Sequence, residues 1–149
     1  MKVISTNRKA SFNYFIEDKF EAGIILTGSE IKSLRNGKAS IEEAYISDYK
    51  GELYLINSNI AKYAQSNQFN HDEKRQRKLL LHSKQVNKFL GFLKIKGNTI
   101  IPLKMYFNDN NRVKVEIAIA SGKKLFDKRA TIKERDWQRE KGRLLRKGK

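Results

Sequence analysis

The clearest pattern in the chain is a strict alternation of apolar and polar positions between residues 113 and 119. Four branched residues at every second position share one face: Val113, Val115, Ile117 and Ile119. Successive side chains of a β-strand point to opposite sides, so this spacing predicts a strand with one buried face. The sequence TIIPLKMYF precedes it, and NDNN lies between the two segments. Pro102 cannot donate a ladder hydrogen bond, which predicts that its strand is an edge strand or is bulged there.

Further strands are predicted in the first half of the chain. Residues 12–26 contain FNYFI and AGIIL, separated by the acidic stretch EDKFE. Residues 44–63 contain AYISDY and ELYLIN on either side of Lys50-Gly51, which is a hairpin signal.

Two helices are predicted between these strands. Thr27 and Glu30 have the spacing of a capping box, and Gly37 stands where the helix would end. Three cations of this segment are expected to point outward: Lys32, Arg35 and Lys38. In SKQVNKFLGFLKIKG, Ser83 is the expected cap, Gly97 the expected end, and one face is apolar: Val86, Phe89, Leu90 and Leu93.

About six short antiparallel strands with two inserted helices predict a mainly β fold, a small OB-like antiparallel barrel. The polar stretch QSNQFNHDEKRQRK, which lacks periodicity, predicts a long exposed loop. We assign residues 1–120 to the barrel and residues 121–149 to a basic C-terminal tail.

Charge separates the tail from the barrel. The formal net charge of the 149 residues is +16, and residues 121–149 carry 12 bases and 4 acids, which is half of it. Such a field favours polyanions, nucleic acid first and an anionic membrane second. The tail has little apolar area for docking on the barrel, so we expect it to be disordered when free and helical when a polyanion neutralises it. A solvated tail that only maintains solubility is the alternative, although the apolar residues Phe126, Trp137, Leu144 and Leu145 argue against it.

Composition limits the compartment and the chemistry. There are no cysteines, which excludes disulfides and thiolate chemistry. No apolar run is long enough for a signal peptide or a membrane span, so we expect a cytoplasmic protein without membrane contact. His71 and His82 have no metal-ligand spacing, and no phosphate loop or nucleophile motif is present. We therefore expect no metal, no cofactor and no enzymatic activity; a small basic nuclease is the least favoured alternative.

Three clusters of basic and aromatic residues indicate nucleic-acid binding. They are NRKASFNYF, with Arg8 and Lys9; KRQRKLLLH, residues 74–82; and the tail. Cations bind phosphates, and exposed rings stack on unpaired bases. For Leu79 and Leu81 the favoured interpretation is a core role instead.

The clusters, read in order, resemble a known family. NRKA, FEAGIILTGSEIKSLRNGKASIEEAY, RKLLLH, GKKLFDKR and KERDWQREK are similar to small protein B, the SsrA-binding proteins of bacteria, from about residue 7 to residue 141. The resemblance implies an OB-like barrel that binds transfer-messenger RNA (tmRNA, or SsrA) and delivers it to stalled ribosomes for trans-translation. The barrel would replace the missing anticodon arm in a tRNA mimic, and the tail would enter the vacant messenger channel and contact small-subunit RNA. A general basic RNA-binding protein or ribosome-associated RNA chaperone is the alternative, and we expect a monomer when free.

The resemblance also assigns residues. Glu21, Leu80 and His82 match positions that the family uses against the tRNA-like domain. This use is chemically reasonable for Glu21, because a carboxylate can accept hydrogen bonds from base amino groups. Leu80 would then point outward while its two neighbours point inward. Together with the basic clusters, the expected tmRNA contacts are Arg8, Lys9, Glu21, Arg35, Lys38, Arg75, Arg77, Lys78, Leu80 and His82.

The tail residues expected to act on the ribosome are Gly122, Lys123, Lys124, Phe126, Asp127, Lys128, Arg129 and Trp137. Two residues depart from the family pattern. Phe12 stands where a histidine is common and Phe126 where a tyrosine or histidine is usual, so both can stack but cannot donate a hydrogen bond.

Overall fold

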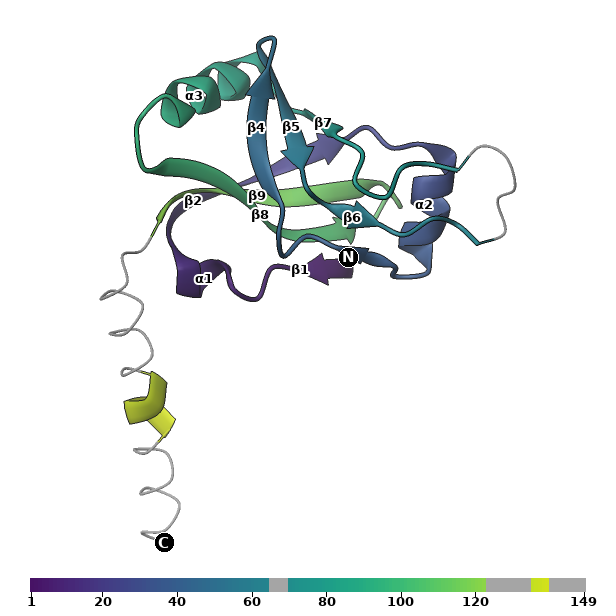
Figure 1. Cartoon of the computed structure of the whole chain (residues 1–149), viewed down its shortest axis with the longest axis horizontal. Coiled ribbons are helices and arrows are strands. Elements are labelled where there is room, and N and C mark those ends of the chain that lie inside the picture. Colours follow the sequence, from purple (N-terminus) through teal and green to yellow (C-terminus); the bar gives the residue numbers. More distant parts are fainter. Residues whose placement is uncertain (65–69, 123–134, 140–149) are drawn as a thin grey trace, which may run out of the picture.

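The computed structural model describes residues 1–64, 70–122 and 135–139 (Figure 1). In chain order, the elements are β1 Lys2–Thr6, α1 Ala10–Asn13, β2 Tyr14–Ile24, α2 Gly28–Arg35, β3 Ala39–Ser40, β4 Tyr45–Tyr49, β5 Glu52–Ile56, β6 Asn59–Ile60, β7 Arg77–Leu80, α3 Ser83–Leu93, β8 Asn98–Phe107 and β9 Val113–Gly122. A further helical segment covers residues 135–139.

Six of the strands form a closed ring of antiparallel pairs. β8 pairs with β4, and the ring continues through β5, β7, β2 and β9 back to β8. β1 adds to β8 outside the ring, and β3 and β6 form a separate two-stranded sheet. The prediction of a mainly β, OB-like antiparallel barrel with inserted helices is confirmed.

Both predicted hairpins are present. Lys50 and Gly51 have φ values of 50° and 76°, and positive φ at both central residues is the requirement of a type I′ turn between β4 and β5. The second hairpin joins β8 to β9, and its register shifts between Pro102 and Lys104. β8 is flanked by β1 as well as β9, so Pro102 is accommodated by a bulge rather than by an edge position.

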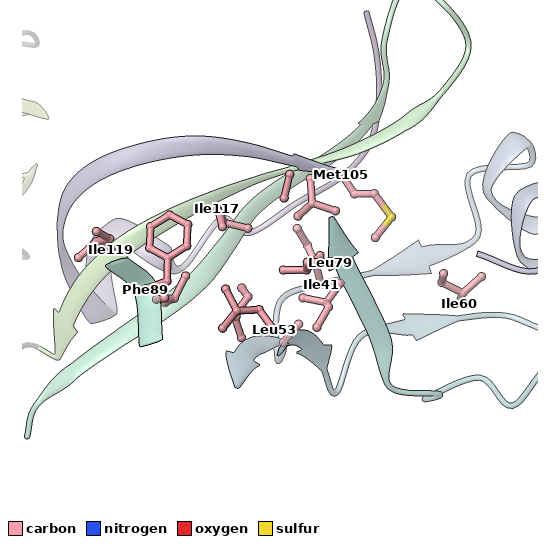
Figure 2. Close-up of a cluster of buried hydrophobic side chains, with 14 of the residues drawn as sticks. Ile41, Leu53, Ile60, Leu79, Phe89, Met105, Ile117 and Ile119 are labelled. Atoms are coloured by element: carbon pink, nitrogen blue, oxygen red, sulfur yellow. The ribbon is translucent and has the colours of Figure 1, made fainter. Parts of the chain in front are cut away.

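The barrel interior is a single apolar cluster to which most of the strands and α3 contribute (Figure 2). Phe89 of α3 is completely buried, and its ring meets Phe20 of β2 edge to face at 4.9 Å. Val115, Ile117 and Ile119 point into this cluster, as their alternation predicts. The opposite face of β9 is covered too, because Ala118 packs with Ala10 of α1 in a second, smaller cluster.

Both predicted helices are present, and only α3 differs from the prediction at its ends. α2 has the complete Thr27–Glu30 capping box, and Gly37 follows it with φ of 70°. α3 starts at Ser83, so His82 rather than Ser83 is its N-cap, and it ends at Leu93. Figure 1 shows these helices at well-separated places on the barrel.

Several segments differ from the predicted elements, and the short strands β1, β3 and β6 were not predicted. Residues 10–13 form the short helix α1 instead of strand, and β2 is one long strand whose register shifts between Ile16 and Lys19, where the acidic interruption was seen. The predicted long exposed loop is wrong at two places. His71 is buried and hydrogen-bonded to Ser29 Oγ and to the Ile60 carbonyl, both at 2.8 Å, and the last two residues of the predicted loop, Arg77 and Lys78, belong to β7. Residues 65–69 of that loop lie outside the described residues.

The expected tail begins where β9 ends. β9 runs to Gly122, which pairs with Tyr14, so the last strand extends two residues past the predicted boundary at residue 120. The expected disorder of the free tail concerns mainly residues 123–134 and 140–149, which lie outside the described part of the chain.

Candidate nucleic-acid interface

The pairing of β2 with β7 brings three of the expected contact residues together. Gly23 is opposite Leu80 in the antiparallel register. Leu79 is 2% exposed and belongs to the core, whereas Leu80 is 51% exposed and Leu81 is half-buried against the core. This is the outward and inward alternation that the RNA-binding interpretation requires.

Leu80, Glu21 and His82 line one open pocket of about 390 Å³. Lys114 of β9 and Gln85 of α3 complete its polar rim. The pocket therefore combines an exposed aliphatic surface, a carboxylate, an imidazole and a cation, which can meet an unstacked base and its phosphate.

Gly23 lies where the two strands approach each other closely at this pocket. A Cβ atom on Gly23 would lie 3.2 Å from the Leu80 Cβ, closer than ordinary van der Waals contact. The missing side chain lets Leu80 lie against the β2 backbone, and the sequence analysis did not single this glycine out.

Tyr106 is a second residue at this site that the sequence analysis missed. Its hydroxyl donates a hydrogen bond to Glu21 Oε2, and its ring is buried in β8. Tyr106 stands in an apolar stretch, 85 positions from Glu21, so no local pattern links the two.

The cations of α2 and its C-terminal end form a separate basic surface. Lys32, Arg35 and Lys38 are exposed as predicted, and the Lys32 ammonium lies 5.6 Å from the centroid of the Tyr63 ring. Arg35 also lines a pocket beside Lys2 and the β8–β9 turn. These side chains are available to phosphates.

Arg77 does not fit its expected role as an RNA contact. Its side chain has no exposed surface, and its Nε donates to Glu30 Oε2. Its remaining nitrogens donate to Ser58 Oγ at 2.9 Å and to backbone carbonyls of residues 58, 72 and 73. A guanidinium whose three nitrogens are all engaged inside the fold cannot reach a phosphate, and this assignment is corrected.

Arg75 is shared between the same network and the surface. Its Nη2 donates to Glu30 Oε1 at 2.6 Å and to the Ile25 carbonyl at 3.1 Å, and about a third of its side chain is exposed. Lys78, the next outward-pointing cation of the cluster, is partly exposed and lies 3.7 Å from Glu52. Of the basic cluster at residues 75–78, Lys78 is therefore the better candidate for RNA.

Glu30 organises this network and is ionised in it. Burial alone would raise the pKa of Glu30, but the hydrogen bonds from Arg75, the Thr27 amide and Arg77 outweigh it and lower the pKa below its ordinary value. The Glu30 carboxylate therefore has two roles, because it caps α2 and forms ion pairs with both Arg75 and Arg77.

The lowered pKa predicts acid sensitivity. A carboxyl whose pKa falls on folding stabilises the folded state above its unfolded pKa, about 4.3, and the stabilisation is lost as the pH falls through the folded value. In urea unfolding between pH 7 and pH 3, we expect the stability gap between the wild type and Glu30→Gln to be widest near neutral pH and to shrink below about pH 4. The exposed Glu43→Gln serves as the control, with no such gap. A gap for Glu30→Gln that stays constant with pH would contradict the assignment.

Arg8, Lys9 and Phe12 lie at the other end of β2. Arg8 and Lys9 are exposed and line a pocket with Phe12 and Arg135. The Arg135 guanidinium lies 5.5 Å from the centroid of the Phe12 ring, a cation–π contact between the helical segment 135–139 and α1. Phe12 thus provides a ring face, as expected of a phenylalanine at this position.

The remaining tail assignments are described only in part. Trp137 is 59% exposed in segment 135–139, and Gly122 is exposed at the end of β9. Lys123, Lys124, Phe126, Asp127, Lys128 and Arg129 lie outside the described residues. Within residues 1–64, 70–122 and 135–139, no group of three or more His, Asp or Glu side chains is placed to hold a metal ion. Across the same residues no helix is long and apolar enough to cross a membrane.

The family model described as SmpB protein matches residues 4–147. The chain belongs to the SmpB family. The match covers the barrel and nearly all of the tail, so the resemblance read from the sequence blocks is confirmed.

Similar proteins agree with this SmpB membership. The SsrA-binding protein of Nitrobacter winogradskyi is 61% identical over 146 residues, which cover 98% of this chain and 93% of that protein. The SsrA-binding protein of Rickettsia canadensis is 59% identical over 145 residues, covering 97% of this chain and 95% of that protein. A solved chain described by the words "tmRNA-SmpB: a journey to the center of the bacterial ribosome" is 44% identical, with a TM-score of 0.67 over 80% of this chain and 84% of that chain.

Proposed function

We propose that this protein binds transfer-messenger RNA and delivers it to stalled ribosomes as an adaptor in trans-translation. The observation that carries the proposal is the pocket that brings Glu21, Leu80 and His82 together on a member of the SmpB family. Its relatives are named SsrA-binding proteins, and the solved chain similar to it is described with tmRNA and the bacterial ribosome.

The geometry supports separate sites on the barrel for contacts to bases and contacts to phosphates. Leu80 offers an exposed apolar surface for a base, and Glu21 offers carboxylate oxygens to its amino group. Phosphate contacts are proposed for the exposed or partly exposed cations of the barrel: Arg8, Lys9, Arg35, Lys38, Arg75 and Lys78. Base-directed groups thus lie at one pocket, and the proposed phosphate-directed groups lie on several other elements of the barrel.

The tail is proposed to act on the ribosome after RNA binding, through residues 122–129 and Trp137. Its share of the net charge suits the vacant messenger channel, which is lined by RNA. In this proposal the protein is a cytoplasmic monomer when free, has no catalytic activity, and completes a tRNA mimic in place of the anticodon arm.

The test is binding to tmRNA in the presence of excess bulk RNA across a salt series. Phosphate contacts release counterions, so the affinity is expected to fall with salt, while a selective complex persists near physiological ionic strength. Free displacement by bulk RNA would support the alternative, a general basic RNA-binding protein, which the net charge of +16 by itself would allow. Incubation of labelled RNA with divalent metal tests the nuclease alternative, and intact RNA is the expected result.

A further inference from the structure

Tyr106 lies beside the proposed pocket, opposite the pocket residue Lys114 in the β8–β9 register. It belongs to β8, which pairs with β9, and β9 pairs in turn with β2. Its side chain is 6% exposed, yet its hydroxyl donates to Oε2 of Glu21, whose residue is exposed on β2. A buried ring thereby holds one oxygen of an exposed carboxylate.

The surroundings of Glu21 make this contact informative. Glu21 stands directly opposite Glu116 in the β2–β9 register, and like charges in such a pair repel each other. Glu116 has a cation as its partner, since Lys104 Nζ lies 3.8 Å from its Oε2. For Glu21 the partner is the uncharged Tyr106 hydroxyl, which orients the carboxylate without pairing it with a cation.

The hydroxyl of Tyr106 is a hydrogen-bond donor throughout the neutral pH range. Burial, followed by its hydrogen bond to Glu21, raises the pKa of Tyr106 above its ordinary value. A raised tyrosine pKa keeps the proton on the oxygen throughout the neutral range. Within the described residues, the Tyr106 bond is the one hydrogen bond that holds the Glu21 carboxylate.

We propose that Tyr106 is a positioning residue for RNA recognition: its hydroxyl holds the Glu21 carboxylate in the orientation that presents the remaining oxygen to a base amino group beside Leu80. The inference rests on the proposed function, because it needs Glu21 to be an RNA contact. A carboxylate free to rotate would lose side-chain entropy on binding, and a carboxylate already held by Tyr106 avoids much of that loss. A lysine at position 106 would instead neutralise the negative charge of the Glu21 carboxylate, which attracts the amino group of the base.

The experiment is Tyr106→Phe, which removes the hydroxyl and keeps the ring. We expect tmRNA affinity to fall about five- to tenfold, the effect of one hydrogen bond that orients a contact group. The urea midpoint should change little, because Glu21 is exposed and water can hydrate its carboxylate. Tyr49→Phe is the matched control, since Tyr49 is exposed on the β4–β5 hairpin and should leave affinity unchanged.

A double-mutant cycle with Glu21→Ala separates positioning from a structural role. In the Glu21→Ala background, Tyr106→Phe is expected to have no further effect on affinity, because the group that it positions is absent. Equal losses in both backgrounds, or wild-type affinity for Tyr106→Phe alone, would overturn the inference. Failure of the wild type to select tmRNA over bulk RNA would instead overturn the proposed function itself, and the inference with it.

Discussion

Replacing Glu21 and Leu80 together with alanine is expected to weaken tmRNA binding by about a hundredfold or more. Burial of a leucine side chain against a base contributes roughly 1.5–3 kcal/mol, and a hydrogen bond to a charged group about 1.5–3 kcal/mol. Both residues are exposed at one pocket, so their removal should leave the fold intact. Binding to labelled tmRNA at fixed salt measures the effect.

The control for this variant makes the same chemical change elsewhere. Glu17 and Ile95 are also an exposed acid and an exposed aliphatic residue, and their joint replacement by alanine should leave affinity close to that of the wild type. A loss of affinity in both double variants would show that the pocket has no special role.

Truncation of the tail tests whether the tail is needed for RNA binding or only for the later step on the ribosome. β9 extends to Gly122, which pairs with Tyr14, so the truncation should remove residues 123–149 and keep the strand whole. We expect the truncated chain to bind tmRNA largely as the full chain does and to fail in tagging stalled chains in a reconstituted translation system. Loss of most RNA affinity in the truncated chain would contradict the division between barrel and tail.

Arg77→Ala is expected to destabilise the protein by about 3–5 kcal/mol, the effect of removing one partner of a buried ion pair. Glu30 would keep its contact with Arg75 but lose the one that is completely buried, and Ser58 would lose a donor at 2.9 Å. Urea unfolding near neutral pH measures the loss.

Lys78→Ala is the matched control for Arg77→Ala, because the two cations are neighbours on β7 with opposite orientations. Its partly exposed contact with Glu52 should contribute less than about 1 kcal/mol. Its loss should instead lower the salt dependence of RNA binding, as expected for a phosphate contact. Wild-type stability of Arg77→Ala, combined with weakened RNA binding, would restore the original assignment of Arg77 to the RNA surface.

The local elements could be predicted because their signals lie within a few residues of one another. The Thr27–Glu30 capping box, the Lys50-Gly51 turn and the alternation on β9 are each contained in a short window, and all three are present. The opposite orientations of Leu79 and Leu80 follow from the same period of two. The start of β2 was predicted less well, because the aromatic residues after Ala10 suit a strand while tertiary packing places Ala10 against β9 in a short helix.

The sequence by itself determined the two hairpins, the two longer helices, the basic character and, through its blocks, the family. Only the tertiary structure decided which of the basic side chains reach the surface. Arg77 and Lys78 look alike in a basic run, but closure of the barrel buries the first against Glu30, 47 positions away, and leaves the second at the surface. Tyr106 looks like core, yet its hydroxyl meets Glu21 across β9. Such long-range pairs depend on strand register and barrel closure, which bring together residues that no local spacing connects.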